Sequence, residues 1–133
     1  MHEPYRYVAD VRYFESDAQG VVFNMWYLGY LDEAMTGYLE HVGLSYGELS
    51  DDGLDFQLVR TEVDWADSLR FGDRYEVAVR TEALGRTSVT LSFDVSADGR
   101  AVAKARTVYV VVGTDGSGAR ELTDRIRLAL SLG

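Results

Sequence analysis

Residues 14–42 read FESDAQGVVFNMWYLGYLDEAMTGYLEHV, and this stretch decides the fold. From Val21 to Val42 apolar residues recur at steps of three or four, which predicts a long helix. The apolar side of that helix would carry Leu28, Leu31, Met35, Tyr38, Leu39 and Val42. So few polar residues remain that we expect a sheet to enclose it. Gly29 and Gly37 weaken the helix, and close packing against strands would compensate.

Alternating apolar and polar residues predict five strands, one before the helix and four after it. The expected strands are 5–14, 56–65, 74–83, 87–96 and 101–112. Gly85-Arg86 and Asp98-Gly99 favour hairpins between successive strands. A short helix is expected over 123–130, with Thr123 as its N-cap. Strands grouped apart from a single helix indicate an α+β fold with an antiparallel sheet.

Length and composition limit the classes of function. The 133 residues suit one domain, 1–133, and 47% of them are hydrophobic, enough for a core. The chain has no cysteine, no signal-peptide pattern and no apolar run of about 20 residues, so we expect a cytoplasmic protein without a membrane span. A net charge of −9 argues against nucleic-acid binding, and it also counts against a polyanionic ligand unless basic residues gather locally.

Asp17 is the residue that best fits a chemical role. It follows a predicted strand, Gly20 allows a tight turn three residues later, and a helix then begins. Unpaired amides at a helix start can hold the oxyanion formed when a carbonyl is attacked. A nearby carboxylate can attack or take a proton from water. The alternative is that Asp17 only forms a turn or cap, which is the commoner role of Asp before Gly.

This stretch resembles the signature of the 4-hydroxybenzoyl-CoA thioesterase family, including its YbgC-like acyl-CoA thioesterases. The residues that match in type and spacing are Asp17, Gly20, Val21, Val22, Phe23, Tyr27 and Glu33. Further similarity lies at Arg60, Asp64-Trp65, Gly72-Asp73 and Arg86-Thr87-Ser88. The resemblance departs at Asn24, where many members have His, at Met35, where many have Arg, and at Ser68, where many have Pro.

The resemblance implies a hotdog fold, in which an antiparallel five-stranded sheet wraps around one long helix. It also implies a homodimer or homotetramer with active sites between subunits. Asp17 matches the catalytic carboxylate, and the helix-start amide near Phe23 and Asn24 matches the group that polarises the thioester carbonyl. Coenzyme A would be part of the substrate, and no metal or separate cofactor is expected.

The remaining expected site residues fall into two groups. Substrate contacts would be Gly20, Val22, Trp26, Tyr27, Asp64 and Trp65. Contacts to the coenzyme A phosphates would be Arg60, Arg86, Lys104 and Arg106. For the aromatic residues a place in the core is the alternative, and for the charged ones a solvated strand position.

The function expected from these features is hydrolysis of an acyl-CoA, or of an acyl-carrier-protein thioester, to a free acid and a thiol. Asp17 would be the nucleophile or the general base. Two alternatives remain: a noncatalytic acyl-thioester-binding protein and a hotdog hydratase or dehydratase. The hydratase is disfavoured because such enzymes use a His near the helix start, and residues 14–38 contain none.

Overall fold

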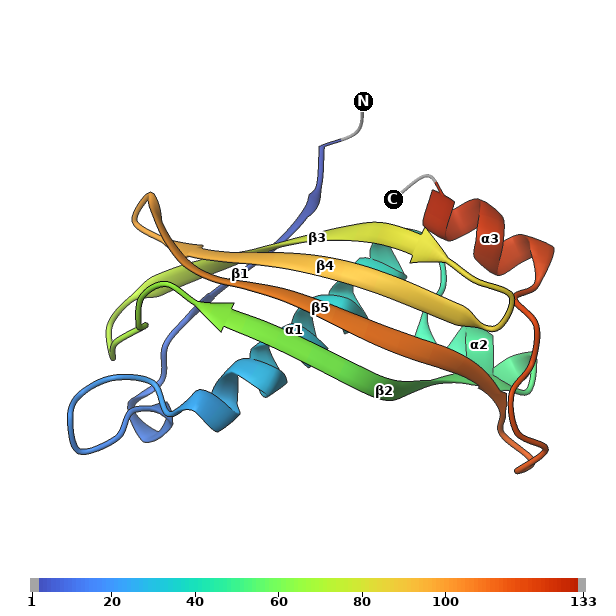
Figure 1. Ribbon diagram of the computed structural model, residues 1–133, viewed down its shortest axis with the longest axis horizontal. Helices are drawn as coiled ribbons and strands as arrows, with labels where there is room; N and C mark the ends of the chain where they lie inside the picture. The colour runs from blue at the N-terminus through green and yellow to red at the C-terminus, as the bar shows by residue number, and fades with distance from the viewer. Residues whose placement is uncertain (1–2, 132–133) are drawn as a thin grey trace.

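The computed structural model describes residues 3–131, and these form a five-stranded antiparallel sheet with one long helix along one face (Figure 1). The strands are β1 (Tyr5–Asp10), β2 (Leu54–Trp65), β3 (Arg74–Leu84), β4 (Ser88–Ala97) and β5 (Arg100–Gly113). The helices are α1 (Asn24–His41), α2 (Tyr46–Asp51), α3 (Asp124–Ser131) and the 3₁₀ turn η1 (Tyr13–Glu15). The expected α+β class and the order of elements are confirmed.

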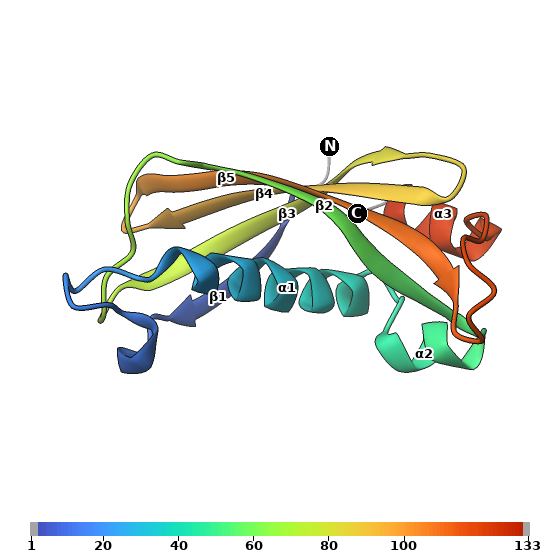
Figure 2. The same ribbon diagram turned by 60° about the horizontal axis from the view of Figure 1, so that its bottom comes forward.

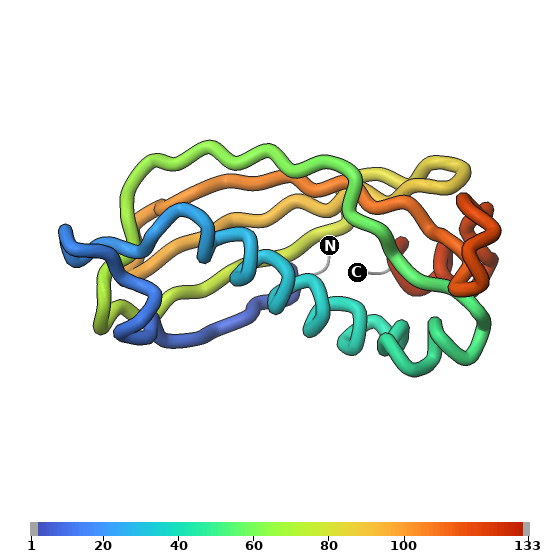
Figure 3. Tube along the Cα trace, turned by 90° about the horizontal axis from the view of Figure 1, so that it is seen from below, coloured from blue at the N-terminus to red at the C-terminus, as the bar shows by residue number. Residues whose placement is uncertain are grey.

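The sheet has the order β1-β3-β4-β5-β2, with every neighbouring pair antiparallel. The sheet curves over α1, as expected for a hotdog fold, and Figures 2 and 3 show the helix running beneath its concave face. Strands β1 and β2 form the two edges, so β2 pairs with β5 on one side only within this chain. An open strand edge presents main-chain amides and carbonyls that another strand can pair with.

Helix α1 buries three of the side chains that its spacing predicts, Leu31, Tyr38 and Leu39, and also buries Tyr27, Tyr30 and Ala34. Four buried residues, Tyr27, Tyr30, Ala34 and Tyr38, face the sheet, and Tyr30 stacks on Tyr75 with ring centroids 4.5 Å apart. Leu28, predicted as a core position, is 49% exposed. The sheet therefore covers one side of the helix, as expected for this fold, and leaves the Leu28 side open.

The two helix glycines have different surroundings. A Cβ at Gly37 would collide with the hydroxyl of Tyr5 from β1, so the predicted close packing is confirmed there. A Cβ at Gly29 would meet nothing within 4 Å, so close packing inside this chain does not explain that glycine.

Glu33, on the same helix, accepts a hydrogen bond from the Tyr7 hydroxyl at 2.6 Å. Partial burial, together with this carboxylate, raises the pKa of Tyr7 to about 12.

The chain leaves the sheet earlier than predicted at its first strand. The strand expected over 5–14 ends at Asp10. The Val11 amide still donates to the Asp73 carbonyl in the register of the β1–β3 pair, and the chain then turns into η1. Tyr13, which falls within the expected strand, lies in η1 and is 76% exposed. At the α3 end of the chain the Thr123 hydroxyl accepts a hydrogen bond from the Ile126 amide at 3.1 Å, as predicted for an N-cap.

Within residues 3–131 no helix is long and apolar enough to cross a bilayer.

Candidate active site

Asp17 lies at the tip of a loop whose shape is fixed by main-chain hydrogen bonds. The Asp17 amide donates to the Val21 carbonyl at 2.8 Å, and the Gly20 amide donates to the Asp17 carbonyl at 2.9 Å. Gly20 has φ +78°, a conformation that favours glycine. This turn explains why the motif needs Gly three residues after Asp. Below it, Ser16 and Val22 pair as an antiparallel bridge that closes the loop.

The Asp17 carboxylate is held at one oxygen and open at the other. Its Oδ1 accepts from the Gln19 amide at 2.8 Å, and no hydrogen bond from residues 3–131 reaches Oδ2. The side chain is exposed. Asp17 therefore presents a carboxylate oxygen that has no hydrogen-bond donor among residues 3–131, on a loop fixed by main-chain hydrogen bonds.

The start of α1 supplies unpaired amide donors beside this loop. Phe23, the residue before the helix, donates its amide to the Glu15 carbonyl at 3.0 Å, so this amide is not free to hold an oxyanion. The prediction for Phe23 is corrected accordingly. The Asn24 and Met25 amides, which begin the helix, have no acceptor among residues 3–131. The Asn24 side chain does not cap the helix.

A second segment, residues 66–73, packs against the Asp17 loop. The Val22 amide donates to the Leu69 carbonyl at 2.7 Å, and Val21 pairs with Arg70 as an isolated antiparallel bridge. Tyr27 of α1 accepts from the Leu69 amide at its hydroxyl, at 2.9 Å. Sequence reasoning noted Ser68 and Gly72-Asp73 of this segment but not its contact with the Asp17 loop, because nothing in the spacing shows which loop it contacts.

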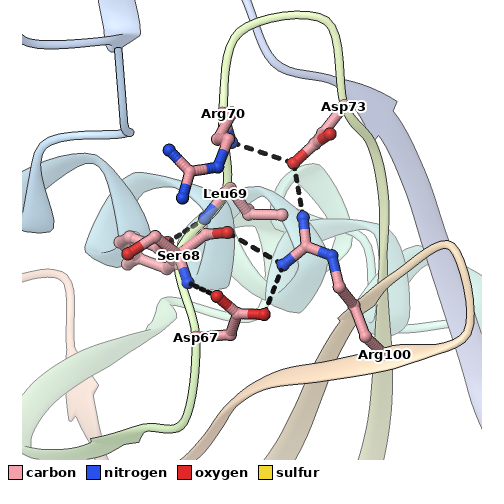
Figure 4. Close-up of polar contacts among 7 residues, drawn as sticks. Asp67, Ser68, Leu69, Arg70, Asp73 and Arg100 are labelled. Carbon is pink, nitrogen blue, oxygen red and sulfur yellow. Dashed lines mark hydrogen bonds and ion pairs between the residues drawn. The ribbon is translucent and has the colours of Figure 1, made fainter. Parts of the chain in front are cut away.

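Arg100 holds the 66–73 segment in place (Figure 4). Its guanidinium donates to Asp67 at 2.8 Å, to the Ser68 carbonyl at 2.9 Å and to Asp73 at 2.7 Å. Hydrogen bonds lower the pKa of Asp67, the larger effect coming from the Ser68 amide and the smaller from the Arg100 guanidinium. The Arg70 guanidinium points away from this cluster.

The predicted substrate contacts divide between core and surface. Val22 and Tyr27 are each 2% exposed and belong to the core, as the alternative reading expected. Trp65 lies beside the helix, edge-on to Tyr27 at 5.7 Å, and is 45% exposed. Trp26 is half-buried and packs edge-on against Phe14. Asp64 lies on the opposite face of the sheet, because it shares a surface hollow with Lys104 and Arg106.

The predicted phosphate contacts are not gathered near Asp17. Lys104 and Arg106 lie in that same hollow of about 330 Å³ and pair with Asp94 and Glu82. Arg60 pairs with Glu62 in β2. Arg86 pairs with Glu121 at the β3–β4 turn, at the end of the sheet away from the Asp17 loop (Figure 1). Within one chain, therefore, these four cations form no shared anion site.

Arg70 is the cation that the structure does place beside the loop. Among the lysines and arginines of residues 3–131, only Arg70 and Arg80 make neither an ion pair nor a side-chain hydrogen bond. Arg70 is exposed and its main chain pairs with Val21. No signal in the sequence separates it from the other arginines.

The comparison with protein families agrees with this geometry: the model of the thioesterase-like superfamily matches residues 11–130. The chain belongs to this superfamily. The thioesterase assignment expected from the Asp17 motif is thus confirmed, and the enzyme class is thioester hydrolase. The family match therefore favours a thioester hydrolase over the two alternatives, a hydratase and a noncatalytic binding protein.

Individual relatives of this thioesterase carry compatible names. A protein of Aquifex aeolicus named as an esterase is 34% identical over 109 residues, 82% of this chain and 85% of its own length. A 1,4-dihydroxy-2-naphthoyl-CoA hydrolase of Synechococcus elongatus is 24% identical over 92% of each chain. A solved Thermus thermophilus thioesterase, complexed with coenzyme A and Zn, has a TM-score of 0.83 at 31% identity over 98% of this chain and 93% of its own.

Proposed function

We propose that this thioesterase hydrolyses acyl-CoA thioesters with Asp17 as its reacting carboxylate. The observation that carries the proposal is the Asp17 loop, whose Oδ2 meets no donor from residues 3–131 and whose Ser16–Val22 bridge lies directly before the helix start, where the Asn24 amide has no acceptor from the same residues. The Asn24 amide would hold the thioester oxygen as negative charge develops on it. The helix dipole at this end adds partial positive charge. Coenzyme A in the solved Thermus relative supports this carrier.

Two routes give the same products. In the first, Oδ2 of Asp17 bonds to the carbonyl carbon, the carbon–sulfur bond breaks, and coenzyme A leaves as a thiolate. Water then hydrolyses the mixed anhydride and restores the carboxylate. In the second, Asp17 takes a proton from water while that water attacks the carbon; the carbon–sulfur bond then breaks, and Asp17 gives the proton to the leaving thiolate, which restores the carboxylate. Both routes need only the carboxylate, the amide donor and water.

We propose that a second copy of the chain completes the pocket. Large apolar side chains are exposed on α1 and on the neighbouring edge strand β2, namely Phe23, Met25, Leu28, Leu58, Val59 and Trp65. Exposed apolar surface of this kind marks an interaction site. The unpaired edge of β2 adjoins it, and pairing two such edges would join two sheets. Such a homodimer would enclose Asp17, which one chain leaves open.

We propose Arg70 as a phosphate contact for coenzyme A. It is exposed, has no side-chain partner among residues 3–131, and its main chain adjoins the Asp17 loop at Val21. An arginine fork binds phosphate oxygens well, and a free one need not first break an ion pair. The alternative contacts Arg60, Arg86, Lys104 and Arg106 each pair with a carboxylate.

Thiol release tests the proposal directly. The chain, purified with and without Asp17→Asn, is incubated with acetyl-CoA, benzoyl-CoA and palmitoyl-CoA while a disulfide reagent detects free thiol. We expect thiol release from at least one thioester by the unchanged protein and strongly reduced release by the variant. The three acyl groups also report the size of the acyl pocket. Binding of all three without turnover would favour a noncatalytic role, and hydration of an enoyl-CoA would favour a hydratase.

A further inference from the structure

Glu15 is a fully buried carboxylate only two residues before Asp17. Its side chain has no exposed surface, although Asp17 itself is exposed. Four donors surround it: Oε1 accepts from the Arg12 amide at 2.8 Å and from the Tyr30 hydroxyl at 2.9 Å. Oε2 accepts from Nη2 of Arg12 at 2.8 Å and from Nε at 3.2 Å. A buried charge is tolerated in a protein only with such partners.

These contacts join the three segments that build the candidate site. Arg12 lies just after β1, and Tyr30 is a buried residue of α1. The main-chain carbonyl of Glu15 accepts from the Phe23 amide, immediately before Asn24. Glu15 thus contacts the strand end, the helix body and the helix start, while the Asp17 loop begins one residue later.

We infer that Glu15 is a positioning residue that, together with Arg12 and Tyr30, sets the position of the Asp17 carboxylate relative to the Asn24 amide. The inference rests on the proposed function. Glu15 does not reach the reacting atoms itself, because its carboxylate is enclosed by its own partners. Its role follows from the demands of the reaction, since a displacement of about 1 Å between reacting groups can cost about 100-fold in rate.

Two tyrosines of α1 provide a matched pair of variants. Tyr30→Phe removes the hydroxyl that donates to Glu15, and Tyr38→Phe removes a hydroxyl that bonds to Thr81 at 2.6 Å. Both rings are buried in the same helix, so both changes remove one buried hydrogen bond. Only the first bond reaches the Asp17 loop. Glu15→Gln is the stronger variant, because an amide cannot accept all of the four donors.

We expect Tyr30→Phe to lower kcat about tenfold and Glu15→Gln about 100-fold, with KM within about twofold of the unchanged enzyme. Tyr38→Phe should leave both constants unchanged. Amide hydrogen exchange gives a second readout that does not require activity. Exchange over residues 17–23 should be faster in Tyr30→Phe than in Tyr38→Phe, at temperatures where both variants are folded.

The outcomes separate this inference from the proposed function. If the unchanged enzyme releases thiol and both Tyr30→Phe and Glu15→Gln keep its kcat, the positioning role is overturned and the function stands. Equal loss of kcat in Tyr30→Phe and Tyr38→Phe would also overturn it, since the effect would then be general destabilisation. If the unchanged chain releases no thiol from any thioester, the proposed function falls and the inference falls with it. Should Glu15→Gln not fold, the tyrosine pair decides.

Discussion

The Val22 amide donates to the Leu69 carbonyl at 2.7 Å, which fastens the Asp17 loop to a segment far from it in the sequence. Arg100 braces that segment through Asp67 and Asp73. The candidate site therefore has two supports: the Glu15 contacts beneath the loop and the 66–73 segment beside it. The second support also determines which arginine adjoins the site.

Arg70→Gln should weaken substrate binding without changing the chemical step. Loss of one charge-assisted contact to phosphate costs about 1.5 kcal/mol, which raises KM for an acyl-CoA about tenfold while kcat changes little. The effect should diminish at high salt, since the contact is between exposed charges. Steady-state kinetics at two ionic strengths measures the rise in KM and its dependence on salt.

Arg80→Gln is the matched control, because Arg80 is the other exposed arginine without a partner among residues 3–131 and lies on β3. It removes the same charge and should leave KM unchanged. A truncated thioester of N-acetylcysteamine, which has no phosphates, should not distinguish Arg70→Gln from the unchanged enzyme. An equal rise in KM for this truncated substrate would contradict a phosphate contact.

The sequence predicts the elements better than their contacts. Alternation and helical spacing locate α1 and all five strands, because burial on one face imposes those periods. The face of α1 was predicted in part: Leu31, Tyr38 and Leu39 are buried as expected, whereas Tyr27 and Tyr30 are buried and Leu28 is exposed. The position of the sheet determines which of these side chains is buried, and the tyrosines pack against it.

For the site, the local part was predictable and the distant part was not. The Asp17 turn follows from Asp and Gly at fixed spacing, and the structure has that turn. Arg70 was missed because its proximity to Val21 depends on how the 66–73 segment folds back. Lys104 and Arg106 were proposed as phosphate contacts from charge alone, whereas their strand alternation puts them on the outer face with acidic partners.

Asp17→Asn should lower kcat by about 100- to 10,000-fold, the range by which a positioned general base or similar group contributes. The melting temperature should hardly change, because the side chain is exposed and the amide oxygen of Asn can still accept from Gln19. Asp51→Asn, an exposed position on α2, is the control for charge and should retain full activity. Thiol release and a thermal melt of each variant decide the matter, and an active Asp17→Asn enzyme would remove this carboxylate from the mechanism.

Val59→Lys should separate the proposed dimer. Val59 is 53% exposed at the point where the β2–β5 register shifts, and a lysine on an edge strand opposes pairing with another edge. Sedimentation velocity should show the unchanged chain as a dimer or larger, and the variant should dissociate at a concentration at least about tenfold higher. Activity should fall in parallel with dissociation, since each pocket would need both chains.

Leu128→Lys is the control for this interface. Leu128 is 65% exposed on α3, at the other end of the sheet from the Asp17 loop (Figure 1). It adds the same charge to an exposed apolar position and should leave assembly and activity unchanged. A monomeric and fully active unchanged chain would contradict the shared pocket.

Glu15 should make the stability of the fold depend on acidic pH. Burial alone would raise the pKa of Glu15, but the hydrogen bonds from Arg12 and Tyr30 outweigh it and hold the pKa below its ordinary value of 4.5. The unfolded chain then binds a proton at Glu15 more readily than the folded chain does. Its stabilisation is therefore complete above about pH 4.5 and is lost as the pH falls through the lower pKa of the folded state.

Glu15→Gln should remove this pH dependence. At pH 7 we expect the variant to be about 2 kcal/mol less stable to urea, because the donors of Arg12 and Tyr30 lose their charged acceptor. Between pH 7 and pH 3 the unchanged chain should lose more free energy of unfolding than the variant, so that the difference between them narrows. The other carboxylates titrate in both proteins and cancel in that difference. If the difference in free energy of unfolding between the two proteins stays constant down to pH 3, these donors do not hold Glu15 as a carboxylate.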